Sequence, residues 1–414
     1  MEPIKAIVLG AGSRGQWSYG QYGLNNPQDI NFIAVAEPDK GRREEFVRNH
    51  KVDQENVFED WREVLKKDKF ADLVCVCVQD RMHFEPAMAA MDLGYDVLLE
   101  KPISPTYEEC KLLAEKAKEK GVSVGVAHVL RYTPFFETIK RLVDGKEYGK
   151  IKGIDLRENV GHLHYSHSYV RGNWRNEAMS TPMILAKSCH DLDILLYLIG
   201  SNCTELSSYG NRGYFSSKNK PTDAPYRCLD GCSHRDTCPY YAPKIYLNGN
   251  IGWPTNVITT DLTTEGITEA LREGPYGRCV FSCDNDMTEH QVVAIKFAND
   301  VCASFSMSAF TEETTRSIKI MMDNGEIIGD LVTDSIRVVN YSTREVKNIN
   351  HIVSGTSGHA GGDAGFMKDF IEHLKDKEHF PLKTSIDIAL ESHKMAFAAH
   401  KSMLEGEAID MSKF

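Results

Sequence analysis

The chain has 414 residues, of which 42% are hydrophobic and 26% charged, the composition of an ordinary globular protein. That length allows two or three domains of roughly 150 residues each and a core that needs no disulfides. The formal net charge of −11 argues against a nucleic-acid or anionic-membrane partner. No apolar run approaches the ~20 residues of a membrane span, and the N-terminus lacks the parts of a signal peptide. We therefore expect a soluble, cytoplasmic protein whose 11 cysteines are buried thiols or metal ligands.

The first third of the chain alternates short apolar runs with amphipathic stretches. The apolar runs predict strands, and the stretches between them predict helices, one of which starts with a Thr106/Glu109 capping box and ends at Gly121. Continuous apolar strands separated by helices favour a parallel, doubly wound sheet. The predicted strands are residues 5–9, 32–36, 73–78, 95–99 and 122–126, and the predicted helices include residues 86–93 and a segment that begins at Ser104-Pro105 and ends at Gly121.

The first predicted strand runs into Gly10-Ala11-Gly12-Ser13-Arg14-Gly15, a GxGxxG pattern. Its place between a strand and a helix is what a dinucleotide fingerprint requires, because the glycines allow a tight turn, close approach to a pyrophosphate and close helix packing. Glu37, at the end of the second strand, is positioned to accept hydrogen bonds from the adenosine ribose. A carboxylate there favours NAD over NADP, although Arg42 and Arg43 leave NADP open. The predicted cofactor contacts of this turn are Gly10, Gly12, Ser13, Arg14, Gly15 and Glu37.

Two further motifs lie at the carboxyl ends of predicted strands, where ligands bind in such sheets. They are Gln79-Asp80-Arg81-Met82-His83 and Glu100-Lys101-Pro102. With the GxGxxG and a later His190-Asp191-Leu192-Asp193 segment, they occur in the order found in the Gfo/Idh/MocA oxidoreductases, which this chain resembles over nearly its whole length. The resemblance implies an α/β fold: an N-terminal Rossmann domain followed by an α+β domain with an open, largely antiparallel sheet.

The resemblance also implies catalytic residues. Lys101 is expected beside the nicotinamide, taking part in proton transfer from the reacting hydroxyl, and His190 is the second catalytic candidate. Many family members carry Asp four residues before this histidine, whereas this chain has Ala186 there. Lys187, three residues before His190 and so on the same helix face, is inferred to hold substrate or to keep a neighbouring base neutral. The further cofactor contacts that the resemblance implies are Gln79, Asp80, His83, Glu100, Lys101, His128 and Arg131. For Arg131 an interdomain salt bridge is the equal alternative.

The sequence pattern changes beyond residue 150. Apolar and polar residues alternate there in short segments that predict strands, and tight turns such as Asp323-Asn324-Gly325 join them. We expect a Rossmann domain over residues 1–130 and a substrate-binding and oligomerisation domain over residues 131–414, with a cysteine-containing insert at about 220–285. The predicted strands here are residues 151–158, 292–297, 301–308, 317–322, 326–331 and 335–339; late helices are expected around 366–374 and over 389–404.

Two polar clusters of this domain are candidates for sugar contacts, because they mix hydroxyl, imidazole, guanidinium and aromatic groups. One spans residues 161–175, where a metal bound by its histidines or a purely structural loop are the alternatives. The other is Gly358-His359-Ala360-Gly361-Gly362-Asp363, which resembles a segment at the sugar site of NAD-dependent glycosidases; a helix start capped by Asp363 is the alternative. The predicted substrate contacts are His162, His164, His167, Tyr169, Arg171, Trp174, Lys187 and His359.

The insert carries Cys228-x3-Cys232-x5-Cys238, with Cys279 and Cys283 downstream. Three close cysteines and one distant cysteine predict a structural zinc site at Cys228, Cys232, Cys238 and Cys283, with Cys279 as the alternative fourth ligand. Unligated thiols, an iron–sulfur cluster and disulfides are the other interpretations.

Together these features predict an NAD-dependent dehydrogenase of a sugar, glycoside or cyclitol, in which Lys101 with His190 moves the hydroxyl proton. The alternative is a redox-neutral glycosidase that uses tightly bound NAD through a 3-keto intermediate. A non-catalytic NAD or sugar sensor is a third class, which the intact Lys101 and His190 disfavour. The expected partners are a small carbohydrate and, because the sheet is open, further copies of this chain in a homodimer or homotetramer.

Overall fold

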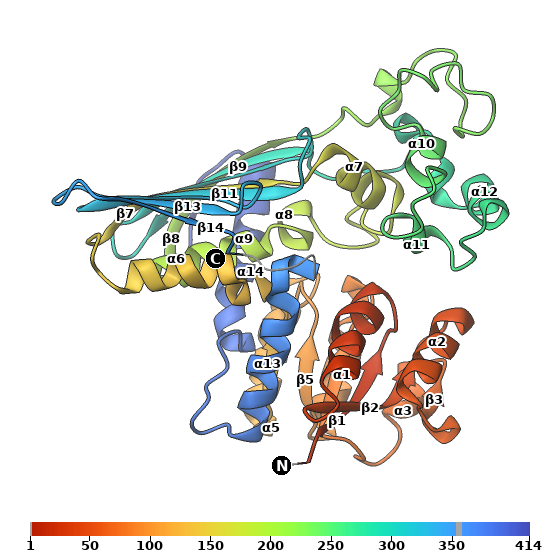
Figure 1. The fold of residues 1–414 in the computed structure, drawn as a ribbon, viewed down its shortest axis with the longest axis horizontal. Coiled ribbons are helices and arrows are strands. Elements are labelled where there is room, and N and C mark those ends of the chain that lie inside the picture. Colours follow the sequence, from red (N-terminus) through yellow and green to blue (C-terminus); the bar gives the residue numbers. More distant parts are fainter. Residues whose placement is uncertain (1, 353–357) are drawn as a thin grey trace.

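The structure, a computed structural model, describes residues 2–352 and 358–414 and contains two β-sheets (Figure 1). The first has six parallel strands in the order β3-β2-β1-β4-β5-β6. This is the predicted doubly wound sheet, and its five strands other than the two-residue β3 overlap the predicted ones. The strands are β1 Ile4–Leu9, β2 Ile30–Ala36, β3 Val57–Phe58, β4 Leu73–Val76, β5 Asp96–Leu99 and β6 Val124–Val126.

Helices cover both faces of this sheet, and their ends follow local sequence signals. Helix α5, Tyr107–Lys120, starts where the Thr106 side chain accepts a hydrogen bond from the Glu109 N–H at 3.3 Å and ends at the left-handed Gly121. The Glu109 carboxylate accepts a hydrogen bond from Ser104, so only the Thr106 half of the predicted capping box is observed. The other helices of the unit are α1 Gln21–Asn25, α2 Lys40–His50, α3 Trp61–Val64 and α4 Phe84–Asp92.

The second sheet has nine strands in the order β14-β13-β12-β11-β7-β10-β9-β8-β15. Only β10 and β7 pair in parallel, so the prediction of a largely antiparallel sheet is confirmed. The strands β8, β14 and β15 are additional to the predicted set. The strands are β7 Ile151–Asn159, β8 Cys203–Asn211, β9 His290–Phe297, β10 Cys302–Ser308, β11 Thr315–Met322, β12 Gly325–Asp330, β13 Ser335–Asn340, β14 Val346–Asn350 and β15 Ile409–Asp410.

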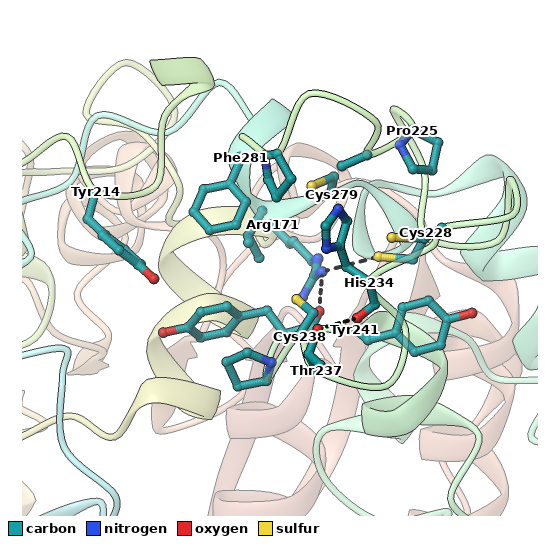
Figure 2. Close-up of a pocket in the computed structure, with 16 residues that line it drawn as sticks. Arg171, Tyr214, Pro225, Cys228, His234, Thr237, Cys238, Tyr241, Cys279 and Phe281 are labelled. Atoms are coloured by element: carbon teal, nitrogen blue, oxygen red, sulfur yellow. Dashed lines mark hydrogen bonds between the residues drawn. The ribbon is translucent and has the colours of Figure 1, made fainter. Parts of the chain in front are cut away.

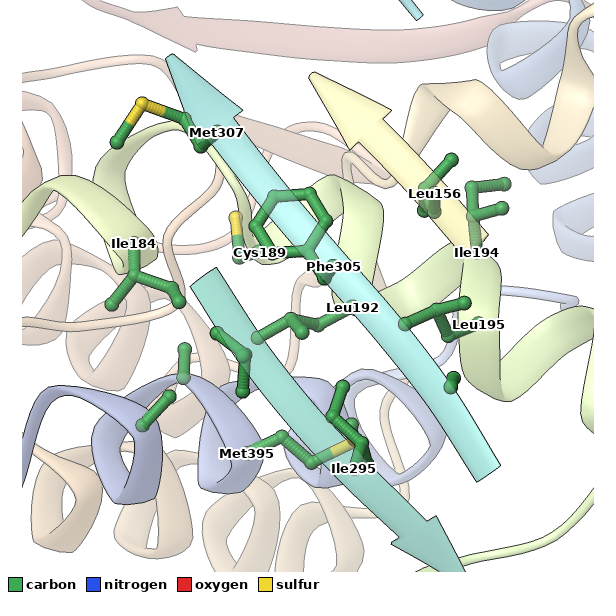
Figure 3. Packing of buried hydrophobic residues seen from close by; sticks show 14 of the residues in the cluster. Leu156, Ile184, Cys189, Leu192, Ile194, Leu195, Ile295, Phe305, Met307 and Met395 are labelled. Carbon is green, nitrogen blue, oxygen red and sulfur yellow. The ribbon is translucent and has the colours of Figure 1, made fainter. Parts of the chain in front are cut away.

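Helix α9, Cys189–Ile199, packs its apolar side against one face of this sheet (Figure 3). Leu192 and Leu195 lie beneath Phe305 of β10 and Ile295 of β9, all almost fully buried. Cys189 is fully buried among these side chains, and burial raises its thiol pKa to about 12, which fits a packing role and not a nucleophile. The well-packed helix fixes the position of His190 at its first turn.

The C-terminal helices return to the first sheet. Helix α13, Gly362–Lys375, contributes Phe366 and Phe370 to the core that also contains Val8 of β1. The Thr384 carbonyl accepts a hydrogen bond from the Val126 N–H at 2.9 Å, and α14, Ile386–Glu405, packs on α5 and α9. Contacts thus cross the boundary expected at residue 130, and the division into two domains stays a prediction.

The predicted insert forms a separate lobe with a small core of its own (Figure 1). That core includes Ala242, Tyr246 and Leu271, all fully buried. Within residues 2–352 and 358–414, no helix is long and apolar enough to cross a membrane. The helices of the lobe are α10 Ala242–Tyr246, α11 Thr255–Ile258 and α12 Thr264–Glu273; those preceding it are α6 Pro134–Asp144, α7 His162–Tyr165 and α8 Met183–Ala186.

Candidate active site

The glycine turn leaves β1 and opens a helix that begins π-helical over Ser13–Gly20. Gly10 has φ +91°, and a Cβ on Gly15 would lie 2.0 Å from the Gly10 carbonyl oxygen, so both positions require glycine. A Cβ on Gly12, in contrast, would meet a single atom of the described residues within 4 Å, Arg42 Nη1 at 4.0 Å. The side of Gly12 is therefore open at a helix N-terminus, the arrangement that suits a dinucleotide pyrophosphate.

Glu37 closes this turn from the end of β2. Its buried carboxylate accepts hydrogen bonds from the backbone N–H of Ala11 at 2.7 Å and of Asp39 at 2.9 Å. Arg43 is engaged by the Glu37 carbonyl and by Glu59, whereas Arg42 extends toward Gly12. Glu37 thus shapes the turn, and its contact with a ribose remains a prediction.

Arg14 links the turn to two other segments. Its Nε donates to Glu100 Oε1 at 2.5 Å, and its Nη1 and Nη2 donate to Asp363 at 2.8 and 2.9 Å. Asp363 Oδ1 also lies 3.1 Å from His359 Nδ1. Burial alone would raise the pKa of the Asp363 carboxyl, but the Arg14 charge holds it well below the usual range. Tyr19 donates a further hydrogen bond to Glu100. The structure therefore satisfies Arg14 and Glu100 with protein partners.

The segment 79–83, which follows β4, contacts the segment 100–102, which follows β5. The two ring nitrogens of His83 lie 2.7 Å from the Pro102 carbonyl and 3.1 Å from the Val78 carbonyl, and the Lys101–Pro102 peptide bond is cis. Buried Asp80 accepts a hydrogen bond from the Trp174 indole at 3.1 Å, which joins a predicted cofactor residue to a predicted substrate residue. Gln79 and Ser13 are exposed.

Lys101 extends from the end of β5 toward the second unit. Its Nζ donates to the Ala186 carbonyl at 2.7 Å. This contact sets the ammonium beside Lys187 and near the first turn of α9, where His190 lies. The Lys101 charge is close enough to lower the pKa of His190, so the two predicted catalytic residues lie near each other.

Only 3% of the His190 surface is exposed. Neither nitrogen of its ring has a hydrogen-bond partner within the described part of the chain. Burial, and then the charge of Lys101, hold the pKa of His190 well below its usual range, so the ring is neutral near pH 7. The ring centroids of His128 and His359 lie 5.7 and 5.9 Å away. Burial lowers the pKa of His128 to about 4. An unpartnered, neutral imidazole is free to accept a proton from a ligand.

Lys187 belongs to a buried charge network that the sequence did not reveal. Its Nζ lies 3.4 Å from Glu158 Oε1, and Arg316 contacts both Glu158 and Asp191 at 2.7 Å. Burial raises the pKa of Glu158 and lowers that of Lys187. The lysine therefore stands at the site with a carboxylate partner, one residue after Ala186.

Arg131 makes a buried ion pair with Asp193 of α9. It donates to both carboxylate oxygens of Asp193 at 2.7 and 2.6 Å and to the Lys383 carbonyl at 3.0 Å. Both charged side chains are buried. Of the two interpretations of Arg131, a cofactor contact or a salt bridge, the structure contains the salt bridge, with Asp193.

The 161–175 segment divides between the site and the insert. His164 lies 5.2 Å, ring centroid to ring centroid, from Trp253 of the insert, and burial and the Lys187 charge lower its pKa well below the usual value. His167 stacks on Tyr276 at 4.8 Å and its Nδ1 lies 2.9 Å from the Tyr246 hydroxyl. The ring of Tyr169 packs 5.6 Å from that of Tyr165, and His162 Nδ1 lies 3.2 Å from the Thr311 carbonyl. Arg171 turns away, donating to the carbonyls of Arg278 and Tyr240 at 2.8 and 2.7 Å.

The predicted zinc site is not supported. In residues 2–352 and 358–414, no group of three or more His, Cys, Asp or Glu side chains is arranged to hold a metal ion. Cys228, Cys232 and Cys238 instead line a cavity of about 190 Å³ with Cys279 (Figure 2). Cys283, the predicted fourth ligand, is absent from that lining, and its Sγ donates to the Cys279 carbonyl at 3.4 Å. The thiols therefore surround a space instead of converging on one ion.

Comparisons with known proteins agree with this geometry. Residues 4–128 match the model of the oxidoreductase family's NAD-binding Rossmann fold, and residues 140–411 match that of its C-terminal alpha/beta domain. The NAD(+)-dependent scyllo-inositol 2-dehydrogenase of Bacillus subtilis (strain 168) is 27% identical over 277 residues, 66% of this chain and 69% of that protein. A 2,7-anhydro-N-acetylneuraminate hydratase of Mediterraneibacter gnavus is 24% identical over 221 residues, 51% of this chain and 53% of that protein.

The solved structure of levoglucosan dehydrogenase with NADH and levoglucosan has a TM-score of 0.74 at 16% identity, covering 99% of this chain and 100% of that one. With both family domains matched in order along most of its length, the chain belongs to the Gfo/Idh/MocA family of oxidoreductases.

Proposed function

We propose that this protein is an NAD-dependent dehydrogenase that oxidises a ring hydroxyl of a sugar, glycoside or cyclitol. The observation that carries the proposal is that Lys101, at the carboxyl edge of the parallel sheet, lies near the unpartnered imidazole of His190. The relatives named scyllo-inositol 2-dehydrogenase and levoglucosan dehydrogenase act on hydroxylated rings of this class.

The two groups divide the proton chemistry between them. The Lys101 ammonium leaves the Ala186 carbonyl to bind the reacting hydroxyl and stabilise the developing alkoxide. His190, kept neutral by burial, accepts the proton. NAD, when bound at the glycine turn, supplies hydride acceptance at the nicotinamide ring.

The remaining polar groups of the site bind the substrate's other hydroxyls. Lys187 carries donors, and the imidazoles of His164 and His359 are kept neutral by burial; the charges of Lys187, His359 and Lys101 all act on His164, and the Trp253 ring makes an edge-to-face contact with it. Aromatic faces pack on the C–H patches of sugar rings, while donors fix the hydroxyl pattern.

The test is NADH formation with a panel of pyranosides, sugar acids and inositols. We expect at least one to yield NADH with the native protein and none with Lys101→Ala. Lys368→Ala, a change of an exposed lysine on α13, is the matched control and should keep the native rate. Turnover that survives Lys101→Ala would overturn the assignment.

The cofactor preference follows from the end of β2. The Glu37 carboxylate would repel the 2′-phosphate of NADPH, so we expect NADH to bind more tightly than NADPH. Glu37→Ala should reduce this difference in affinity, since the variant lacks the carboxylate and the Arg42 guanidinium lies close to the turn. Tighter binding of NADPH than of NADH by the native protein would contradict the proposed preference.

A redox-neutral reaction is the second candidate. The chain is also similar to the protein named as a hydratase, and the reaction in that name has no net oxidation. In this chain three imidazoles have a lowered pKa: His164 and His190 near Lys101, and His359, whose ring centroid lies 5.9 Å from that of His190; they are enough bases for an oxidation followed by an elimination. Chromatography of the sugars from the same tubes distinguishes the candidates: cleavage without NADH identifies the redox-neutral reaction.

We also propose that the open face of the nine-stranded sheet pairs with a second copy. Tyr209 and Val292 sit opposite each other on β8 and β9 and are exposed by 64% and 40%. Light scattering of the purified chain should give a dimer or tetramer, and a monomer would contradict this assignment.

A further inference from the structure

The imidazoles of His164 and His190 lie in a positive electrostatic environment. Besides burial, the groups that act most on His164 are Lys187, two imidazoles and Lys101, and each of them lowers its pKa. On the pKa of His190 they are Lys101, two imidazoles and Arg316, with the same sign. Among the described residues, no carboxylate is one of the groups that affect these two rings most. A confined space with a field of this sign favours an anionic ligand.

The charges on this side of the site form a network with more cations than carboxylates. Lys187 Nζ lies 3.4 Å from Glu158 Oε1, and Arg316 contacts Glu158 and Asp191, each at 2.7 Å. Burial raises the pKa of the Glu158 carboxyl, which weakens its compensation of Lys187. Lys101 also acts on Lys187, and its own Nζ donates to a backbone carbonyl, which carries no charge. The network around Lys187 therefore contains three cations, Lys101, Lys187 and Arg316, and two carboxylates.

The other carboxylates of the site lie toward the glycine turn and the sheet edge. Glu100 and Asp363 both contact Arg14, at 2.5 and 2.8 Å, and Asp80 accepts a hydrogen bond from an indole N–H. None of these three carboxylates is among the groups that act most on Lys187 or on the two imidazoles. Negative charge thus lies on one side of the site and surplus positive charge on the other, which orients a substrate that carries one negative group.

Hydrogen-bonding groups without protein partners lie on the positive side. Both nitrogens of the His190 ring lack a partner within residues 2–352 and 358–414, and the residue is almost fully buried. The Lys187 ammonium has three N–H donors, and in the described chain Glu158 is the one carboxylate at ion-pair distance from it. The Lys187 charge also acts on His359, whose ring centroid lies 5.9 Å from that of His190. Lys187 and the unpartnered ring therefore border one space, in which a charged acceptor would take up free donors.

From this charge surplus and these free donors we infer that the substrate is a sugar acid, whose carboxylate is bound by the Lys187 ammonium. The inference rests on the proposed function and names the substrate class of that same site. A carboxylate carries one negative charge, which equals the surplus, whereas a phosphate group carries nearly two and exceeds it. Lys187 is then the residue that sets the specificity, because a neutral hexose leaves its charge without a ligand.

The test compares substrates that differ in one charge. The probes are the methyl glycosides of glucuronic, galacturonic and mannuronic acid, each with the corresponding hexoside and with the methyl ester of the acid. NADH formation gives kcat/KM for each probe. The native protein should use at least one acid with a kcat/KM about 10- to 100-fold above those of its hexoside and its ester, the factor that one hydrogen bond to a charged group supplies. Equal or faster turnover of the uncharged forms would overturn the inference.

Variants of Lys187 identify the group that recognises the charge. Lys187→Met removes the ammonium and should lower the acid-to-hexoside ratio of kcat/KM by about 10- to 100-fold, through KM more than through kcat. Lys187→Arg keeps the charge and should keep most of the preference for the acid. Lys368→Met, at an exposed lysine of α13, is the control and should keep the native ratio. A native ratio in Lys187→Met would overturn the assignment of this residue.

Binding measurements separate this inference from the proposed function. With NADH bound, the native protein cannot accept a hydride, so calorimetric titration of each acid and its hexoside reports affinity alone. Tighter binding of an acid without any NADH formation in the turnover assay would overturn the dehydrogenase and keep the carboxylate site. NADH formation without tighter binding of an acid would overturn the carboxylate site and keep the dehydrogenase. If no probe binds and none is turned over, the sugar-acid assignment is overturned as well.

Discussion

The buried polar groups on the two sides of Lys101 differ in how their hydrogen-bonding atoms are satisfied. On the glycine-turn side, Arg14, Glu37 and His83 bond to other parts of the protein, and Gln16 Oε1 is a single buried oxygen without a partner among the described residues. On the α9 side, both nitrogens of the His190 ring and the Ser188 hydroxyl lack a hydrogen-bond partner within the described residues. Buried polar atoms are normally paired, so a whole ring without partners marks a place where a ligand completes the structure. The comparison separates groups that hold the site's shape from groups that act on substrate.

The largest expected effect is on the side with unpaired atoms. His190→Asn should lower kcat about 10²- to 10⁴-fold, the usual contribution of a general acid–base group, because no other group replaces its imidazole. The free energy of unfolding should change little, since no hydrogen bond to the ring is lost. Stopped-flow kinetics and urea unfolding measure the two quantities. A large loss of stability with unchanged kcat would reverse the roles assigned to the two sides.

The matched change on a fully paired group is Arg131→Met. It leaves the Asp193 carboxylate buried without its partner, which costs about 3 kcal/mol or more of unfolding free energy. Urea unfolding at pH 7 measures this loss. Arg141→Met, which changes a surface arginine whose Nη2 donates to Thr138, is the control and should cost less than about 1 kcal/mol.

The free energy of unfolding should depend on pH because several histidines are buried in the neutral form. Burial lowers the pKa of His50 and His128 to about 4 and of His167 and His393 to about 3. The unfolded chain gains protons below about pH 6.5 while these folded residues stay neutral, so the unfolding free energy falls as the pH drops toward 4. The expected loss between pH 6.5 and 5 is on the order of 2 kcal/mol per strongly shifted histidine, measured by urea unfolding. A flat profile in that range would contradict neutral burial.

The smallest expected effect concerns the open side of the glycine turn. Gly12→Ala adds a methyl group that meets no protein atom closer than 4.0 Å, so the melting temperature should stay within a few degrees while NADH affinity falls about tenfold. Gly15→Ala is its counterpart: its Cβ would collide with the Gly10 carbonyl, and stability should fall as well. Calorimetry and NADH titration of both variants compare the two positions. Equal losses of stability would show that Gly12 also is required for packing.

The sequence predicted those parts of the site that depend on neighbouring residues. The apolar runs located the long parallel strands, and the glycines located the turn because each has a local steric cause. The two-residue strand β3 and the polar strand β8 carry no comparable pattern, since β8 alternates few apolar side chains.

The charge network around Lys187 could not be predicted in the same way. Glu158 and Arg316 lie on adjacent strands, β7 and β11, where they are direct neighbours in the sheet register. That pairing joins distant segments, and strand order does not follow from the local sequence. Trp253 and Asp363 reach the site through similar long-range contacts, and only the polar, glycine-rich surroundings of Asp363 gave a signal.

The ion pair between Arg14 and Asp363 joins residues 349 positions apart. The aromatic side chains of Phe366 and Phe370 complete the same core beneath the first strands. During synthesis on the ribosome, the nucleotide-binding unit therefore lacks part of its interior until almost the whole polypeptide has emerged. Nascent chains that stop before residue 358 should expose this apolar surface and depend on chaperones, and only full-length chains should become resistant to protease.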